Sequence, residues 1–175
     1  MVTRHNNEIS QMTTFTNLEV KRPAWQSIVT FALALWLGGS LVLDLVVVPS
    51  LWEAGMMTQP GFASAGYMTF EAFNHLELLF AGTVMTGILW LSGTHYFAGG
   101  WRRTAIVLSA ILLVIPLVYT YILTPQMSAM GIQLDLFSPM DGMPSGMMPM
   151  HLGYWGLEVL KIAGVGALLL GCDRR

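Results

Sequence analysis

Four long apolar stretches constrain this chain more than any other feature of its sequence. A helix rises about 1.5 Å per residue, so about 20 apolar residues cross the hydrocarbon core of a membrane. The stretches that reach this length are Gln26–Val48, Phe70–Phe97, Thr104–Leu123 and Leu152–Gly171. We therefore predict an all-α fold, a four-helix transmembrane bundle over residues 25–175 preceded by a polar tail over residues 1–24. The lipid bilayer is its first expected partner.

Composition agrees with a membrane protein. Hydrophobic residues make up 54% of the chain and charged residues 10%, whereas soluble domains carry about a quarter charged residues. The formal net charge of -2 shows no basic excess, so nucleic acid is not an expected partner.

The basic residues predict the orientation of the bundle, because short cytoplasmic loops carry an excess of Lys and Arg. They precede the first stretch, separate the second from the third, and follow the fourth; they are Arg4, Lys21, Arg22, Arg102, Arg103, Arg174 and Arg175. The two other loops, over residues 49–69 and 124–151, contain no Lys or Arg. With four spans, the three basic regions share one side, and both termini are expected in the cytoplasm.

Prolines mark the expected ends of the helices. Pro49, Pro60, Pro125, Pro139, Pro144 and Pro149 all fall outside the four stretches, as helix-breaking residues should. Pro116 is the exception, and it is expected to kink the third helix by freeing the carbonyl group of Leu112.

Apart from His95 near the cytoplasmic end of the second, the predicted spans carry six ionisable residues: Asp44, Glu71, His75, Glu77, Glu158 and Lys161. A charged side chain at a helix centre costs about 2.5–3.5 kcal/mol on insertion scales. The predicted topology puts all six in the outer half of the membrane. At about 100° per residue, Glu71 and His75 share a face, and Glu77 points nearly opposite His75. Lys161 is expected to pair with Glu158 at i,i+3, or to reach Asp44 or Glu71 across the bundle.

This intramembrane polar cluster has several interpretations. The first is a set of buried or interfacial ion pairs that fix the register of the helices. The second is a functional polar pocket that opens outward and takes a metal, a proton, a quinone headgroup or haem. The third is contact with a partner. His75 and His151 could ligate haem b between the second and fourth helices.

The second outer loop is rich in methionine. Met143, Met147, Met148, Met150 and His151 form a candidate metal site, because soft thioethers together with imidazole select Cu(I) over harder ions. Alternatively, methionine is a flexible apolar filler on the outer surface of the bundle or against a partner.

Small residues offer surfaces for close helix contact. Ala34 and Gly38 have small-x-x-x-small spacing, and further candidates are Gly39, Gly82, Gly87, Gly164 and Gly166. They are expected to pack the helices of one chain, and a homo-oligomer or a membrane-protein partner remains an alternative.

The first stretch carries a family resemblance. Phe31-Ala32-Leu33-Ala34-Leu35-Trp36-Leu37-Gly38-Gly39-Ser40, followed by Val46-Val47-Val48-Pro49, resembles the opening helix of small four-helix membrane proteins grouped near the copper-resistance protein CopD. Residues 27–35 lack the histidine that such helices often carry, so a metal or haem role is not transferred. The loop over residues 55–63 looks like that of small cyanobacterial membrane proteins, which implies a bacterial plasma membrane or a thylakoid membrane.

The motifs of soluble enzymes are missing from the sequence: it has no nucleophile triad pattern, phosphate loop, zinc signature or nucleotide fingerprint. The first interpretation is therefore a non-enzymatic accessory or scaffold protein of the membrane, with an outward-facing polar pocket and a Met-rich loop. The alternatives are a copper-handling protein that binds Cu(I) through that loop, and a protein that binds haem b or quinone.

Overall fold

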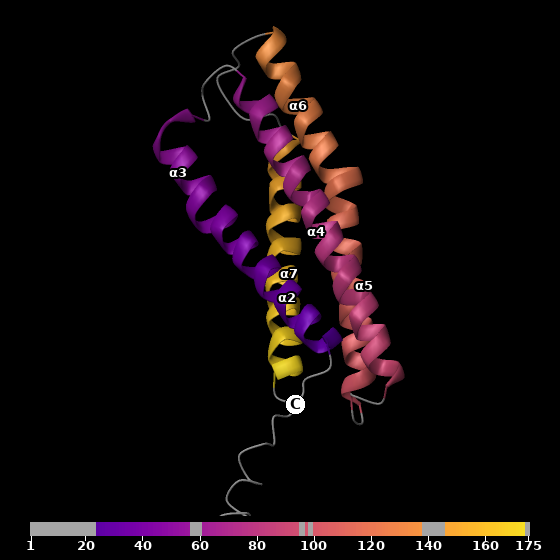
Figure 1. Ribbon diagram of the computed structural model, residues 1–175. Helices are drawn as coiled ribbons and strands as arrows, with labels where there is room; N and C mark the ends of the chain where they lie inside the picture. The colour runs from indigo at the N-terminus through magenta and orange to yellow at the C-terminus, as the bar shows by residue number, and fades with distance from the viewer. Residues whose placement is uncertain (1–23, 57–60, 95–96, 98–99, 138–145, 174–175) are drawn as a thin grey trace, which may run out of the picture.

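Four long helical segments run back and forth along one another in the computed structural model (Figure 1), which describes residues 24–56, 61–94, 97, 100–137 and 146–173. The first segment is continuous through α2 (Ala24–Val42), the π-helical η1 (Leu43–Val47) and α3 (Val48–Glu53). The second is α4 (Phe62–Gly93); the third runs through α5 (Trp101–Val118), the π-helical η3 (Tyr119–Leu123) and α6 (Thr124–Phe137); the fourth is α7 (Met147–Asp173). The predicted all-helical fold with four helices long and apolar enough to span a membrane is confirmed for these residues.

The outward faces of the segments are apolar, as lipid contact requires. Phe31, Leu79 and Val159 lie on three different segments and are 66%, 67% and 64% exposed. In water such side chains would form an unstable surface, whereas hydrocarbon solvates them well.

The segments form a ring in which each packs against two neighbours. α2 contacts α4 and α7, and α5 also contacts α4 and α7, whereas α2 and α5 lie at diagonal corners, as do α4 and α7. The side-chain amide of Gln26 donates to the carbonyl oxygen of Cys172 over 3.0 Å, which ties the start of α2 to the end of α7. These two helix ends and the α4–α5 connection lie at one end of the bundle (Figure 1). We call it the basic end, because Arg102 and Arg103 are exposed there.

The buried apolar core fills one half of the bundle. Between the basic end and the helix midpoints, Val29, Leu33, Ile88, Leu112 and Leu168 are at most 1% exposed. Beyond the midpoints, Leu43 and Tyr119 are the buried hydrophobic side chains of the described residues. Among the described residues of this half, α3 packs against η1, and Figure 1 shows it diverging from α4 and α7. Of the side chains that the structure describes, the buried apolar ones are thus concentrated toward the basic end.

The predicted helix ends were wrong at two prolines, because Pro49 and Pro125 lie inside continuous helical segments. Each follows a π turn directly: the N–H of Val48 donates to the carbonyl oxygen of Leu43, and the N–H of Thr124 donates to that of Tyr119. Proline lacks an N–H and its ring crowds the carbonyl group four residues earlier. A wider π turn relieves both problems, so the helix continues past the proline.

The other predicted bounds also shift. α4 begins at Phe62 rather than Phe70 and ends at Gly93 rather than Phe97. α7 begins at Met147, so Pro149 lies in its first turn, where the missing N–H costs no hydrogen bond. Pro116 lies within α5 as predicted. The other three prolines named above, at positions 60, 139 and 144, lie outside the described residues.

Candidate functional site

Polar side chains from all four segments meet near the midpoints of their helices. Ser40 lies midway along the first segment, Glu77 midway along α4, Tyr119 midway along the third segment and Lys161 midway along α7. We call the following eight residues the central network: Trp36, Ser40, Asp44, Glu77, Tyr119, Tyr154, Glu158 and Lys161.

Lys161 is the hub of the central network. Its ammonium group pairs with the carboxylate of Glu77 and lies 2.7 Å from Oε2 of Glu158, while its side chain is 2% exposed. The pair with Glu77 joins α7 to α4, two helices at diagonal corners of the bundle. The ammonium also lies 5.4 Å from the ring centroid of Tyr119, within range of a cation–π interaction. Lys161 thus crosses the bundle centre.

Glu77 connects this hub to the first segment. Its Oε1 accepts hydrogen bonds from Nε1 of Trp36 and from Oγ of Ser40, both over 3.1 Å, in addition to the ion pair with Lys161. One carboxylate oxygen therefore holds α2, α4 and α7 together.

Glu158 connects the hub to the third segment. Its Oε2 accepts a hydrogen bond from the hydroxyl of Tyr119 over 3.2 Å. The ring of Tyr119 stacks on that of Tyr154 with centroids 4.4 Å apart, which aligns the hydroxyl. The carboxyl group of Asp44, in η1, is buried and interacts electrostatically with Glu158, Lys161 and Glu77.

The charges of the central network do not balance. It contains three carboxyl groups, from Asp44, Glu77 and Glu158, but only one lysine. Each carboxyl group has one buried oxygen without a hydrogen-bond partner among the described residues: Oδ2 of Asp44, Oε2 of Glu77 and Oε1 of Glu158. Burying three carboxylates beside a single ammonium group is costly, so the arrangement favours a proton bound to one of the carboxyl groups.

Both π-helical segments place a member of the central network. Asp44 is the second residue of η1, and Tyr119 is the first residue of η3. Single π turns within α-helices occur frequently at functional sites, because they aim side chains that a regular helix would direct elsewhere. Here the π turns are explained by Pro49 and Pro125, which come directly after them. The two prolines therefore also account for the positions of Asp44 and Tyr119.

The predicted ion pair between Glu158 and Lys161 is present, but the cross-bundle partner of Lys161 is Glu77 rather than Asp44 or Glu71. The placement of all six ionisable residues in the outer half of the membrane stays a prediction. Along their helices, Glu77 and Lys161 lie at the midpoints of α4 and α7.

Glu71 and His75 lie apart from the central network. Glu71 is half-buried, and His75 is exposed on the side of α4 away from Glu77. The Nδ1–H of His75 donates to the backbone carbonyl oxygen of Glu71 over 2.7 Å. His151 lies on α7, at the diagonal corner from α4. Haem binding stays a prediction. The positions of His75 and His151 on α4 and α7 do not direct the two side chains toward a common centre.

Sequence reasoning missed Trp36, Ser40, Tyr119 and Tyr154 as members of the site. A signal was present, because Trp36, Ser40 and Asp44 recur every four residues and so lie along one face of a helix. Tyr154 and Glu158 have the same spacing. Tyr119 had no comparable signal.

The methionine segment is helical where the structure describes it. Met147, Met148, Met150 and His151 belong to the first turns of α7 rather than to a coil, and Met143 lies outside the described residues. Met148 is 55% exposed, and Met150 and His151 are half-buried. These positions spread around a helix rather than along a mobile loop, and Cu(I) binding stays a prediction.

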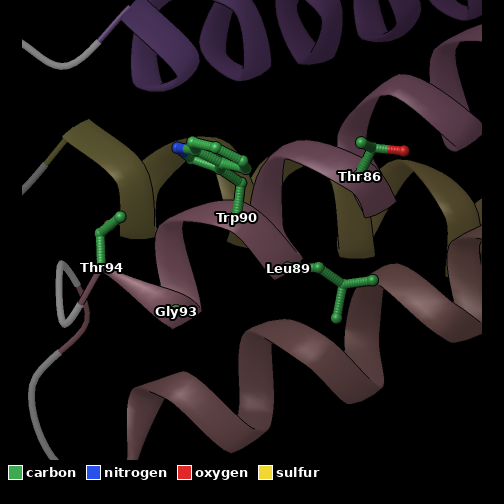
Figure 2. A pocket seen from close by; sticks show the side chains of 5 residues that line it. All are labelled: Thr86, Leu89, Trp90, Gly93 and Thr94. Atoms are coloured by element: carbon green, nitrogen blue, oxygen red, sulfur yellow. The ribbon is translucent and has the colours of Figure 1, made fainter.

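An apolar groove lies on α4 near the basic end and is lined by Thr86, Leu89, Trp90, Gly93 and Thr94 (Figure 2). Four of these residues belong to α4 and Thr94 is its C-cap residue; Leu89 and Trp90 are 47% and 59% exposed. The groove is a surface feature and shares no residue with the central network.

The small residues divide into two sets. A Cβ at Gly87 would lie 2.1 Å from Cγ2 of Val29, and one at Gly164 would lie 3.0 Å from Cδ2 of Leu112, so these glycines pack helices within the chain. A Cβ at Gly39 would meet Phe73 at 3.4 Å. Ala34 and Gly38 are exposed, and a Cβ at Gly38, Gly82 or Gly166 would meet nothing within 4 Å. The predicted packing role thus holds for part of the set.

No family model matches this chain, and neither the curated proteins nor the solved structures include a significant match to it. Its function must be inferred from its own residues.

Proposed function

We propose that this chain is a non-enzymatic, multi-pass accessory protein of a bacterial plasma membrane or thylakoid membrane whose central network binds and releases protons. The observation that carries the proposal is the excess of three carboxyl groups over one lysine, all buried at the middle of four apolar helices.

Charge counting supports the proton as the ligand. With all three carboxyl groups ionised, the network would hold an excess of two negative charges where each charge is costly. Lys161 neutralises one carboxylate, and protons are the smallest species that neutralise the others. Glu77 accepts three hydrogen bonds at Oε1 and is the preferred carboxylate partner of Lys161. The exchangeable proton therefore belongs to Asp44 and Glu158.

The arrangement favours a proton over a metal cation. Within the described part of the chain, no group of three or more His, Cys, Asp and Glu side chains is arranged to hold a metal ion. The Lys161 ammonium also lies 2.7 Å from Glu158, and its charge would repel a cation bound to that carboxylate.

Infrared difference spectroscopy of the purified protein in detergent tests this function. As the pH rises, the carboxylic-acid C=O band of the network should disappear as the shared proton leaves. Asp44→Asn should abolish or shift this band, because it removes one of the two groups that share the proton. Glu71→Gln is the matched control on α4, outside the network, and should leave the band in place. Identical titrations of wild type and Asp44→Asn would show that the network does not exchange protons.

The second prediction concerns which end of the bundle faces the cytoplasm. Since Arg102 and Arg103 lie at the basic end together with the start of α2 and the end of α7, we propose that this end faces the cytoplasm. A reporter fused after Arg175 should be cytoplasmic, and one inserted near Gly142 should be on the opposite side. A reporter after Arg175 that reads as external would overturn this orientation.

A partner is expected at the lipid-exposed surface. The exposed Ala34 and Gly38 give α2 a face where another helix, from a second copy or a different membrane protein, could approach closely.

A further inference from the structure

We infer that the central network exchanges protons with one side of the membrane only, the side opposite the basic end. This inference rests on the proposed function, and it concerns the route that protons take rather than their binding.

The half of the bundle toward the basic end is filled mainly by apolar side chains. Three polar side chains are buried there as well: Gln26 and Ser109 donate to the carbonyl oxygens of Cys172 and Ile106, and Ser92 is the third. The apolar side chains between the network and that end are contributed by all four segments and are at most 6% exposed; they are Val29, Ala32, Leu33, Val84, Ile88, Leu91, Ala105, Leu112, Val165 and Leu168. Close packing of this kind leaves no room for a chain of water molecules. A proton cannot cross such a region, because charge in a dry apolar medium is very costly.

The opposite half is packed differently. Beyond the helix midpoints, Leu43 and Tyr119 are the buried hydrophobic side chains of the described residues. Among the described residues, α3 contacts η1, the π turn that carries Asp44, and it diverges from α4 and α7 (Figure 1). Asp44 is also the most exposed charged member of the network, at 8% compared with 1% for Glu77 and Lys161 and 2% for Glu158. The network is therefore closest to solvent at Asp44.

Polar groups line this half and can support water. The side-chain amide of Asn74 donates to the hydroxyl of Thr124 over 2.8 Å between α4 and α6, and both residues are buried. The titratable and charged groups that interact with Asp44 come from α4 and α7. They are Glu77 from α4, and Tyr154, Glu158 and Lys161 from α7.

The exchange step is a simple proton transfer. The O–H bond of the protonated member of the Asp44–Glu158 pair breaks, and a new O–H bond forms at a water oxygen on the side opposite the basic end. The network then carries one more negative charge. Reprotonation reverses the step from the same side.

The test uses the full-length protein with an affinity tag after Arg175, reconstituted into vesicles. Vesicles that bind the affinity resin carry the basic end outside, and those that do not bind carry it inside. The external pH is stepped while the internal pH is buffered, and the network carboxyl band is followed by infrared difference spectroscopy. Asp44→Asn in the same vesicles identifies the part of the signal that comes from the network.

We expect the band to respond at once when the opposite end faces the external solution. When the basic end faces it, the band should respond only after a proton ionophore equilibrates the two sides. A prompt response from the basic end would overturn this inference while leaving proton binding intact. A carboxylic-acid band in detergent that does not change with pH, or that is the same in wild type and Asp44→Asn, would instead remove the proposed function itself, so the two failures are distinguishable.

Discussion

Lys161→Met is expected to destabilise the bundle by about 3–5 kcal/mol at neutral pH, the usual result of removing one partner from a buried ion pair. Methionine keeps most of the apolar stem, so the loss reports the missing charge rather than a cavity. Lys161 contacts both Glu77 and Glu158, and without it neither carboxylate has a cation nearby. Because protons can replace the lost cation, the destabilisation should be smaller at lower pH. Unfolding with SDS in bicelles, repeated at several pH values, measures both effects.

A double-mutant cycle gives the control for this result. Lys161→Met combined with Glu158→Gln should cost less than the sum of the two single changes, since the double variant strands one carboxylate fewer. The same holds for Lys161→Met with Glu77→Gln across the diagonal of the bundle. Additive losses in both cycles, with no dependence on pH, would contradict an ionic role for Lys161.

Gly87→Ala should destabilise the bundle by about 1–3 kcal/mol, the typical cost of overpacking a close contact. A Cβ at this position would lie 2.1 Å from Cγ2 of Val29, which is fully buried and β-branched, so its methyl group has little freedom to move. The contact joins α2 to α4 in the half of the bundle toward the basic end. The change should therefore separate these helices, and the same SDS unfolding assay should show an earlier transition.

Gly82→Ala is the matched control, one and a half turns away on the same helix. A Cβ there would meet nothing within 4 Å, so alanine should be neutral or stabilising through its higher helix propensity. Equal losses at Gly82 and Gly87 would indicate that α4 tolerates no side chain at either glycine, and that the contact with Val29 is not the cause.

The sequence predicted the contacts within one helix of the central network, but not the contacts between helices. The pair of Glu158 and Lys161 followed from i,i+3 spacing, which depends on one helix alone. The pair of Lys161 and Glu77 could not be predicted in this way. It depends on the diagonal arrangement of α4 and α7 and on the position of each helix along the bundle axis. Tyr119 joins the network from a π turn, a feature that no hydrophobic period indicates.

The sequence by itself determined that this chain forms four apolar helices, and it grouped the basic residues that the fold places at one end. Both features depend on local terms that add along the chain, namely the cost of burying each side chain in hydrocarbon and the requirement that every backbone group be hydrogen-bonded within its helix. Only the tertiary structure decided where the helices end around Pro49 and Pro125, which carboxylate Lys161 reaches across the bundle, and which half of the bundle holds most of the buried apolar side chains. These outcomes depend on the axial shift and ring order of the helices, because a buried charge is stabilised by whichever partner the packing brings within reach.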